Sequence, residues 1–175
     1  MAEEIPHIKY RQANIADIPS VAKVHVQSWR ESFKGIVPQS YLDKMSEEKR
    51  KLAFEKAFTI KGYKMFVAED PKHGIVGFAD CGESRYNKLV EGELYAIYLL
   101  KDFQRKGIGK LLFSLVIRGL VANGKNSISL VCLEKSPYKY FYEKLNGKLH
   151  QKDVTLIEGL EFVTLTYIWK DVALS

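Results

Sequence analysis

Between positions 93 and 133 the sequence places a strand, a glycine-containing turn, a helix and a second strand in series, and this order constrains the fold more than any other feature. Residues 93–100, ELYAIYLL, are apolar at almost every position and rich in β-forming side chains, which predicts a central strand covered on both faces. Apolar residues at helical spacing then predict a helix over 107–122. The next strand, over 127–133, should lie parallel to the first because a helix connects them.

The rest of the chain predicts an α+β order of elements. Further strands are expected over residues 8–12, 63–69, 75–82, 147–152 and 161–170. Further helices are expected from the N-cap candidate Asp17 to about Gly35, over 41–45, after Ser46, and over 138–145 with Ser136 as the cap. We therefore predict one α+β domain over residues 1–175, with a mixed, mainly antiparallel sheet of about seven strands and about four flanking helices.

Composition limits the classes of partner. Of the 175 residues, 46% are hydrophobic and 12% are aromatic, which excludes a disordered tail or a collagen-like protein. The net charge of +6 and the pI near 9.1 favour an anionic partner, such as nucleic acid, a phosphate-bearing cofactor or an acidic surface. Charge alone does not choose among these three.

Short apolar runs and an acidic N-terminal segment predict a soluble, cytoplasmic protein with no membrane partner. The longest run, 94–100, is far shorter than the ~20 residues of a membrane span. Cys81 and Cys132 form no CxxC pair, so we expect two reduced thiols and neither a disulfide framework nor a zinc site. No group of His, Asp and Glu has metal-ligand spacing, so we predict no metal.

The turn at residues 104–110, QRKGIGK, carries the clearest chemical signal. Free backbone N–H groups at a helix N-terminus, glycines that allow close approach, and flanking cations together favour phosphate binding. A P-loop would require glycine in place of Gln104 and Ser or Thr in place of Leu111, and a Rossmann fingerprint would require a small residue in place of Leu112. What remains is the pattern Q-x-x-G-x-G after a β-rich strand.

This pattern resembles the pyrophosphate-binding signature Q/R-x-x-G-x-G/A of the GNAT superfamily of N-acetyltransferases. The preceding ELYAIYLLKDF resembles the family's fourth strand and the loop after it, and PYKYFYEKLNGK resembles its helix with a tyrosine before a glycine. The resemblance spans nearly the whole chain and implies a GNAT-like fold in which the two central parallel strands splay apart. It also implies that acetyl-CoA is the cosubstrate, and that the acetyl group passes to a primary amine of a small molecule or peptide by direct attack in a ternary complex.

Carried over by position, the resemblance implies cofactor contacts on three segments. The pantetheine contacts would be Ile97, Tyr98 and Leu99. The phosphate contacts would come from the turn, at Gln104, Arg105, Lys106, Gly107, Ile108, Gly109 and Lys110. Ser136 stands where the family often has an asparagine that contacts the cofactor, so that contact would come from a shorter side chain.

The resemblance also implies two catalytic residues. Tyr142 matches the tyrosine that protonates the departing thiolate, a role open to a phenol with a reference pKa of about 10. The spacing of Tyr138, Phe141 and Leu145 around it also fits a buried helical stripe. Glu93 matches a glutamate that removes a proton from the amine, often through water, and a charged strand terminus facing solvent is the alternative.

The acceptor is the least patterned part of the site. The N-terminal helices correspond to the walls of the acceptor cleft, so Trp29 and Phe33 are expected to contact the acceptor together with Tyr95. His25 is expected to be a hydrogen-bonded histidine of the core or of the cleft rather than a catalytic base. A polyamine, an amino acid, an aminoglycoside-like drug and a peptide amino group all remain candidates. Acidic residues that could hold a cationic amine are Glu31, Asp43, Glu47, Glu91 and Glu93.

Two functions of other classes compete with catalysis. A family member without activity could bind acyl-CoA as a sensor. A nucleic-acid-binding module would use the charge of +6, but the sequence contains no helix-turn-helix, zinc-finger or RNA-recognition signature. The resemblance also allows a homodimer.

Overall fold

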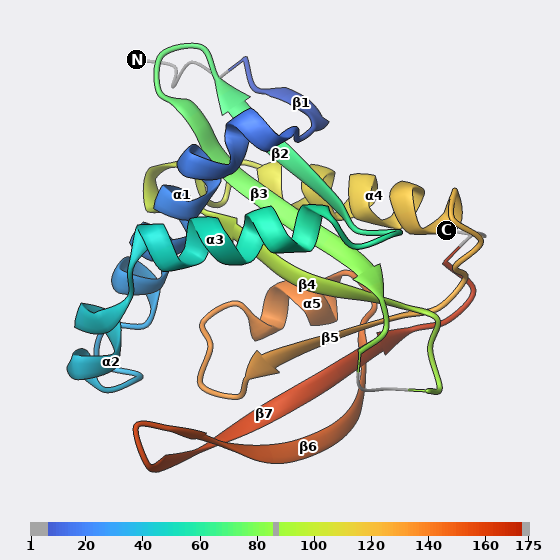
Figure 1. The fold of residues 1–175 in the computed structure, drawn as a ribbon. Coiled ribbons are helices and arrows are strands. Elements are labelled where there is room, and N and C mark those ends of the chain that lie inside the picture. The colour runs from blue at the N-terminus through green and yellow to red at the C-terminus, as the bar shows by residue number, and fades with distance from the viewer. Residues whose placement is uncertain (1–6, 86–87, 173–175) are drawn as a thin grey trace.

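Seven strands form one sheet in the order β1-β2-β3-β4-β5-β7-β6 (Figure 1). The computed structural model describes residues 7–85 and 88–172. The strands are β1 (Lys9–Gln12), β2 (Lys64–Asp70), β3 (Gly74–Glu83), β4 (Gly92–Leu99), β5 (Ile128–Leu133), β6 (Lys148–Ile157) and β7 (Leu160–Trp169). Every pair of neighbours is antiparallel except β4 and β5. The predicted α+β class with a mixed, mainly antiparallel sheet is therefore confirmed.

Helices cover both faces of this sheet. They are α1 (Ile18–Ser32), α2 (Gln39–Lys44), α3 (Glu47–Phe58), α4 (Ile108–Val121) and α5 (Lys139–Lys144), with 3-10 turns at Ile15–Asp17 and Lys101–Phe103. In Figure 1, α1 and α3 lie in front of the sheet and α4 lies behind it. The described residues thus contain five α-helices, one at each expected segment, because the short segment near 41–45 is a helix of its own beside the about four predicted. No helix of the described ranges is long and apolar enough to cross a bilayer.

Alternation along the strands gives the sheet two cores. On β3, Phe78 packs with Val21 and Phe54 from α1 and α3, whereas the neighbouring Ala79 faces the opposite core with Leu112 of α4. Side chains of a strand point alternately to the two faces, so a strand buried on both sides is apolar at successive positions. This explains why the central strands read as continuous apolar runs.

The two central parallel strands separate after two residue pairs. β4 pairs with β5 only through Gly92 with Ile128 and Glu93 with Ser129. Along the rest of its length β4 stays paired with β3, apart from a bulge beside Asp80. The predicted splay is confirmed, and it leaves the β5-facing edge of β4 without a strand partner from Leu94 onward.

The two predicted helix caps differ in outcome. Asp17 is at the N-cap position of α1, as predicted, but it makes no side-chain capping bond, because its carboxylate pairs with Arg11 and accepts the Asn14 backbone N–H, while Asn14 caps the preceding 3-10 turn. Ser136 accepts a hydrogen bond from the Tyr138 backbone N–H, but α5 begins only at Lys139. In both places a short turn precedes the helix and uses the polar side chain first.

The predicted end of the first C-terminal strand at residue 152 is also wrong. β6 continues to Ile157 and reaches β7 through the two-residue turn Glu158–Gly159, where φ is 53° and 78°. Two positive φ values in sequence are typical of the tight turns that suit the twist of a hairpin. Every β6 residue except Ile157 is exposed, so the strand lacks the apolar alternation that sequence analysis requires.

Candidate active site

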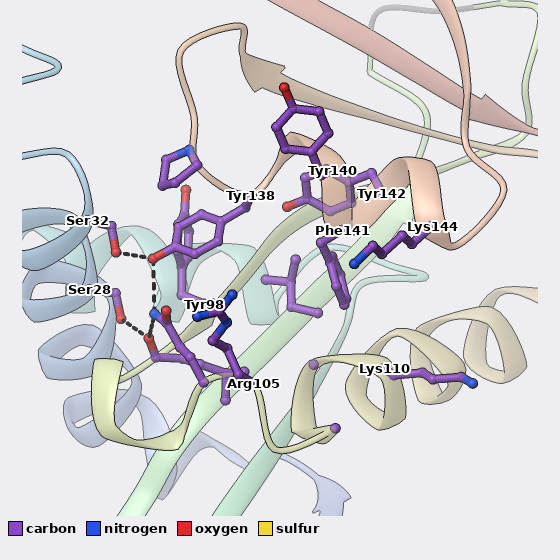
Figure 2. A pocket seen from close by; sticks show the side chains of 16 residues that line it. Ser28, Ser32, Tyr98, Arg105, Lys110, Tyr138, Tyr140, Phe141, Tyr142 and Lys144 are labelled. Carbon is purple, nitrogen blue, oxygen red and sulfur yellow. Dashed lines mark hydrogen bonds between the residues drawn. The ribbon is translucent and has the colours of Figure 1, made fainter.

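A cavity of about 850 Å³ lies between β4, the 104–110 turn, α1 and the segment around α5 (Figure 2). We call it the basic cavity, because three cations line one part of it: Arg105, Lys110 and Lys144. Its other side chains are mostly apolar or aromatic, including Ile97, Leu99, Tyr98, Tyr138, Tyr140, Phe141 and Tyr142. One cavity therefore combines cationic side chains with a mostly apolar lining.

The glycine turn presents backbone N–H groups to this cavity. Arg105 has φ of 61° and Gly107 has φ of 82°, so two residues of the turn are in the left-handed region. Such conformations within a turn gather N–H groups into an anion-binding concavity. α4 then begins at Ile108 without any side-chain cap, which leaves its N-terminal N–H groups available to a ligand.

Glycine at position 109 keeps α4 close to α5. A Cβ built on Gly109 would lie 3.3 Å from the Phe141 ring and 3.5 Å from Leu99. A side chain here would press on the apolar part of the basic cavity. The second glycine of the turn is thus explained by close packing rather than by its φ.

A hydrogen-bonded bridge crosses the basic cavity near the end of β4, and Figure 2 shows its dashed bonds. The Leu99 carbonyl accepts from the Ser28 hydroxyl at 3.2 Å and from the Gln104 amide at 3.1 Å. The same amide donates to the Tyr138 hydroxyl at 3.0 Å, and that hydroxyl also bonds to Ser32. Three distant segments therefore meet at the position where the signature glutamine stands.

Tyr138 is a site residue that the sequence pattern did not indicate. Its spacing predicted only a place in a helical stripe, whereas its hydroxyl makes hydrogen bonds at the cavity wall. The available signal was its place directly after Ser136 and Pro137, at the entrance to a helix. Helix entrances next to a cavity often carry polar contacts because the first turn has unpaired backbone donors.

A second cavity of about 350 Å³ adjoins the first. We call it the aromatic cavity, because Trp29, Phe33, Tyr41, Tyr95 and Tyr98 line it, together with residues of β5, β6 and β7. Four residues line both cavities: Ile97, Tyr98, Tyr138 and Tyr142. The two cavities therefore have a common wall, formed by these four side chains.

Tyr142 lies in the wall that the two cavities share, and its phenol is protonated. It is 6% exposed, and burial raises the pKa of its phenol well above the ordinary value. Its hydroxyl makes no hydrogen bond to any other described residue. At neutral pH the phenol is protonated and free to donate.

Most predicted cofactor residues lie together. The basic cavity is lined by Ile97, Tyr98, Leu99, Gln104, Arg105, Gly107, Gly109 and Lys110. Three residues are placed elsewhere: Ile108 is 2% exposed in the core, Lys106 approaches the Phe103 ring at 5.9 Å, and Ser136 lines only the aromatic cavity.

Glu93 has a position that neither sequence alternative described. It is 3% exposed rather than facing solvent, and it is absent from the lining of both cavities. The Arg85 guanidinium donates to its two oxygens at 2.7 and 3.2 Å. Arg85 also lies over the Tyr95 ring, with its central carbon 4.1 Å from the ring centroid.

Two further titratable groups near the site, His25 and Cys132, are held neutral. Burial lowers the pKa of His25 to about 3, and rings of Trp29 and Tyr98 pack against it, so it lies in the core. The expected hydrogen bond is not found, because its buried Nδ1 has no partner among the described residues. Burial raises the pKa of the Cys132 thiol to about 11, so the thiol is not ionised at neutral pH. The described residues contain no group of three side chains able to hold a metal ion.

Comparison with known proteins agrees with this geometry. A family described as FR47-like protein matches residues 83–156, which include β4, the glycine turn and α5. The uncharacterized N-acetyltransferase YuaI of Bacillus subtilis (strain 168) is 34% identical over 170 residues, with 95% of each chain covered. This chain belongs to the GNAT superfamily of N-acetyltransferases.

As a GNAT N-acetyltransferase the protein is an acetyltransferase enzyme, and solved structures share its fold. A phosphinothricin acetyltransferase from Sinorhizobium meliloti, solved in complex with acetyl-CoA, has a TM-score of 0.72 at 22% identity, covering 93% of this chain and 88% of its own. The PaiA N-acetyltransferase of Thermoplasma acidophilum, solved with coenzyme A, has a TM-score of 0.67 at 20% identity, covering 93% and 98%. The predicted GNAT fold is confirmed.

Proposed function

We propose that this GNAT acetyltransferase moves the acetyl group of acetyl-CoA to a primary amine by direct attack in a ternary complex. The observation that carries the proposal is the meeting of two cavities at Tyr142, where β4 and β5 have separated. One cavity suits a long ligand with an anionic end, and the other suits a second small molecule. Solved relatives of the same fold that hold coenzyme A or acetyl-CoA support this assignment.

The basic cavity matches the parts of coenzyme A in order. Phosphate groups would bind the N–H groups of the 104–110 turn and the cations Arg105 and Lys110. The pantetheine arm would lie along the open edge of β4, over Ile97 to Leu99, where backbone groups lack a β5 partner. This order brings the thioester to the shared wall and to Tyr142.

In the proposed reaction the neutral amine attacks the acetyl carbon of the thioester. A carbon–nitrogen bond forms, the carbon–sulfur bond breaks, and the amine gives up one proton to Glu93 or to water. Backbone N–H groups near Ile97 to Leu99 would hold the oxygen that becomes negative in the transition state. Tyr142 would donate its phenolic proton to the departing thiolate, since its hydroxyl is protonated and unpaired among the described residues.

The predicted base, Glu93, stays a prediction. To take a proton from an amine in the aromatic cavity, its carboxylate would have to leave Arg85, or act through water past Tyr95. A Glu93→Gln variant tests this prediction. If Glu93 is the base, the variant should lose activity and the rise of kcat/KM with pH should change. A variant with an unchanged profile and a lower melting temperature would assign Glu93 to the ion pair instead.

Free-thiol release from acetyl-CoA over a panel of amines tests the proposed function. We expect amine-dependent thiol release, and we expect Tyr142→Phe to lower kcat by about 100-fold while the KM for acetyl-CoA changes little. Phenylalanine keeps the ring, so the packing of this buried side chain is retained. Unchanged kcat in the variant would remove Tyr142 from the acid role, and thiol release that no amine stimulates would contradict the transfer itself.

A further inference from the structure

The aromatic cavity is lined without any charged side chain. None of the described residues that line it is Asp, Glu, Lys, Arg or His. Its polar side chains are hydroxyls, the indole of Trp29 and the thiol of Cys132. The acidic residues considered for a cationic acceptor all lie outside this lining: Glu31, Asp43, Glu47, Glu91 and Glu93.

Packed rings form one wall of the aromatic cavity. Trp29 stacks on Phe33 with ring centroids 4.4 Å apart, and it lies 5.8 Å from the Tyr41 ring. Leu133 and Ile157, from two different strands, are buried in the same cluster as Phe33. Such a wall offers apolar surface and π faces to a ligand, and it offers no ion-pair partner.

The size of the aromatic cavity limits the ligand. A volume of about 350 Å³ is near the lower end of the range for small-molecule sites. The reacting nitrogen must lie at the junction beside Tyr142, because the thioester arrives from the basic cavity. The body of the acceptor is left with the space among Trp29, Phe33 and Leu133.

We infer that the acceptor is a compact monoamine whose body is apolar or aromatic and carries no second charge. This inference rests on the proposed acetyl transfer. A second ammonium or a carboxylate held beside the buried Phe33 and Leu133 would lose water without gaining an ion-pair partner, which is unfavourable. An apolar environment also favours the neutral form of the amine, which is the form that attacks the thioester.

Two matched pairs of amines test the inference on the unmodified protein. Pentylamine and 1,5-diaminopentane differ by a second ammonium at the far end of the chain, and 2-phenylethylamine and 4-(2-aminoethyl)benzoate differ by a carboxylate at the far end of the ring. With acetyl-CoA saturating, we expect kcat/KM to be at least tenfold higher for the member of each pair whose only ionisable group is the reacting amine. Equal or higher kcat/KM for the doubly charged members would overturn the inference and leave the acetyl transfer intact.

A variant of the cavity wall gives a second test. Thr164 lines the aromatic cavity from β7, opposite Leu133 in the strand register. Thr164→Asp adds a carboxylate, and Thr164→Asn adds a neutral side chain of the same shape. We expect the Asp variant to shift the kcat/KM ratio toward 1,5-diaminopentane by at least tenfold, and the Asn variant to leave the ratio within threefold of the unmodified protein.

Different results would contradict the uncharged acceptor and the acetyl transfer itself. A ratio that moves equally in Thr164→Asp and Thr164→Asn would contradict the role of cavity charge. Calorimetric titration of pentylamine and 1,5-diaminopentane into the coenzyme A complex adds a readout without turnover, with tighter binding of pentylamine expected. Absence of thiol release with every amine would overturn the proposed function and the inference with it.

Discussion

At the scale of residues, burial rather than ion pairing sets the protonation state of the groups around the two cavities. Tyr142 and Cys132 keep their protons and His25 stays neutral for the same reason, since each would have to place a charge in an apolar surrounding. Of these two cavities, only the basic one is lined by cationic side chains among the described residues. The protein thus separates a charged binding end from a neutral reaction end.

Asp80 is a buried carboxylic acid whose ionised form is destabilised by the same kind of burial. It is 5% exposed on β3, where Oδ2 accepts the Tyr63 hydroxyl at 2.8 Å and Oδ1 has no partner among the described residues. Burial raises the pKa of its carboxyl to about 6. The folded state therefore binds this proton more tightly than the unfolded chain does.

We expect Asp80→Asn to be more stable than the unmodified protein at pH 7. The raised pKa means that the contribution of Asp80 to the free energy of unfolding falls as pH rises from about 4 to about 6, by up to ~3 kcal/mol for a shift of about two pKa units. The difference in melting temperature between variant and parent should be positive at pH 7 and shrink toward pH 4. Thermal unfolding at pH 4 to 8 measures it, and a difference that is constant across pH would contradict the assignment.

At the scale of elements, the two ends of α4 differ in their relation to the basic cavity. Its N-terminus begins after Gly107 at the basic cavity, and its C-terminus is followed by Gly124, away from both cavities. Both glycines have positive φ, 82° and 76°, and an added Cβ at either would meet nothing within 4 Å. A side chain at either position would therefore meet similar backbone strain, and the two positions differ in what lies beside them.

We expect Gly107→Ala and Gly124→Ala to lose similar stability and differ in cosubstrate binding. Each places a side chain in the left-handed region, at a cost of about 1 kcal/mol in the free energy of unfolding. Only the change at 107 alters the direction of N–H groups that would hold phosphates, so we expect its KM for acetyl-CoA to rise about tenfold. Thermal melts and thiol-release kinetics on both variants measure this, and an equal KM in the two would argue against phosphate binding at the turn.

At the scale of the whole molecule, the splay divides the sheet into two parts that share few hydrogen bonds. β1 to β4 form one part and β5, β7 and β6 form the other, joined by the first residues of β4 and β5. A ligand in the basic cavity would touch β4, α1 and the α5 segment at once. Binding should therefore tie the two parts together.

We expect coenzyme A to slow amide hydrogen exchange on both sides of the splay. A ligand that binds only the folded state raises stability by ~2.7 kcal/mol at a hundred times its Kd. Protection should increase at residues 97–99 of β4 and at residues 138–144 in and before α5, which follow β5 in the chain, and a control region such as β6, which does not line the basic cavity, should change less. Hydrogen-exchange mass spectrometry measures this, and protection confined to β4 would contradict a bridging ligand.

Much of the fold followed from local pattern. The apolar runs of β4 and β5 and the helical spacing of α4 predicted the parallel unit, because central strands and their crossover helix are apolar in a periodic way. The errors fell where local pattern is weak. The exposed β6 strand shows no alternation, and the caps at Asp17 and Ser136 depend on a turn that comes before each helix.

The candidate site likewise contains residues that local sequence predicted and residues that it did not. The anion-binding turn could be predicted because glycines, cations and a helix N-terminus lie within seven consecutive residues, 104–110. Tyr138, which reaches Gln104 and Ser32, could not, since its partners are 34 and 106 residues away. The pairing of Glu93 with Arg85 was missed because the sequence does not say which strand ends are buried.

By itself the sequence determined the order of elements and the chemistry of the glycine turn, because both depend on residues close together in the chain. Only the tertiary structure decided that Tyr142 meets both cavities and that the second cavity contains no charge among the described residues. Those properties arise where α1, β4, β5, β6 and β7 come together, and side chains from such distant segments become neighbours only when the core packs.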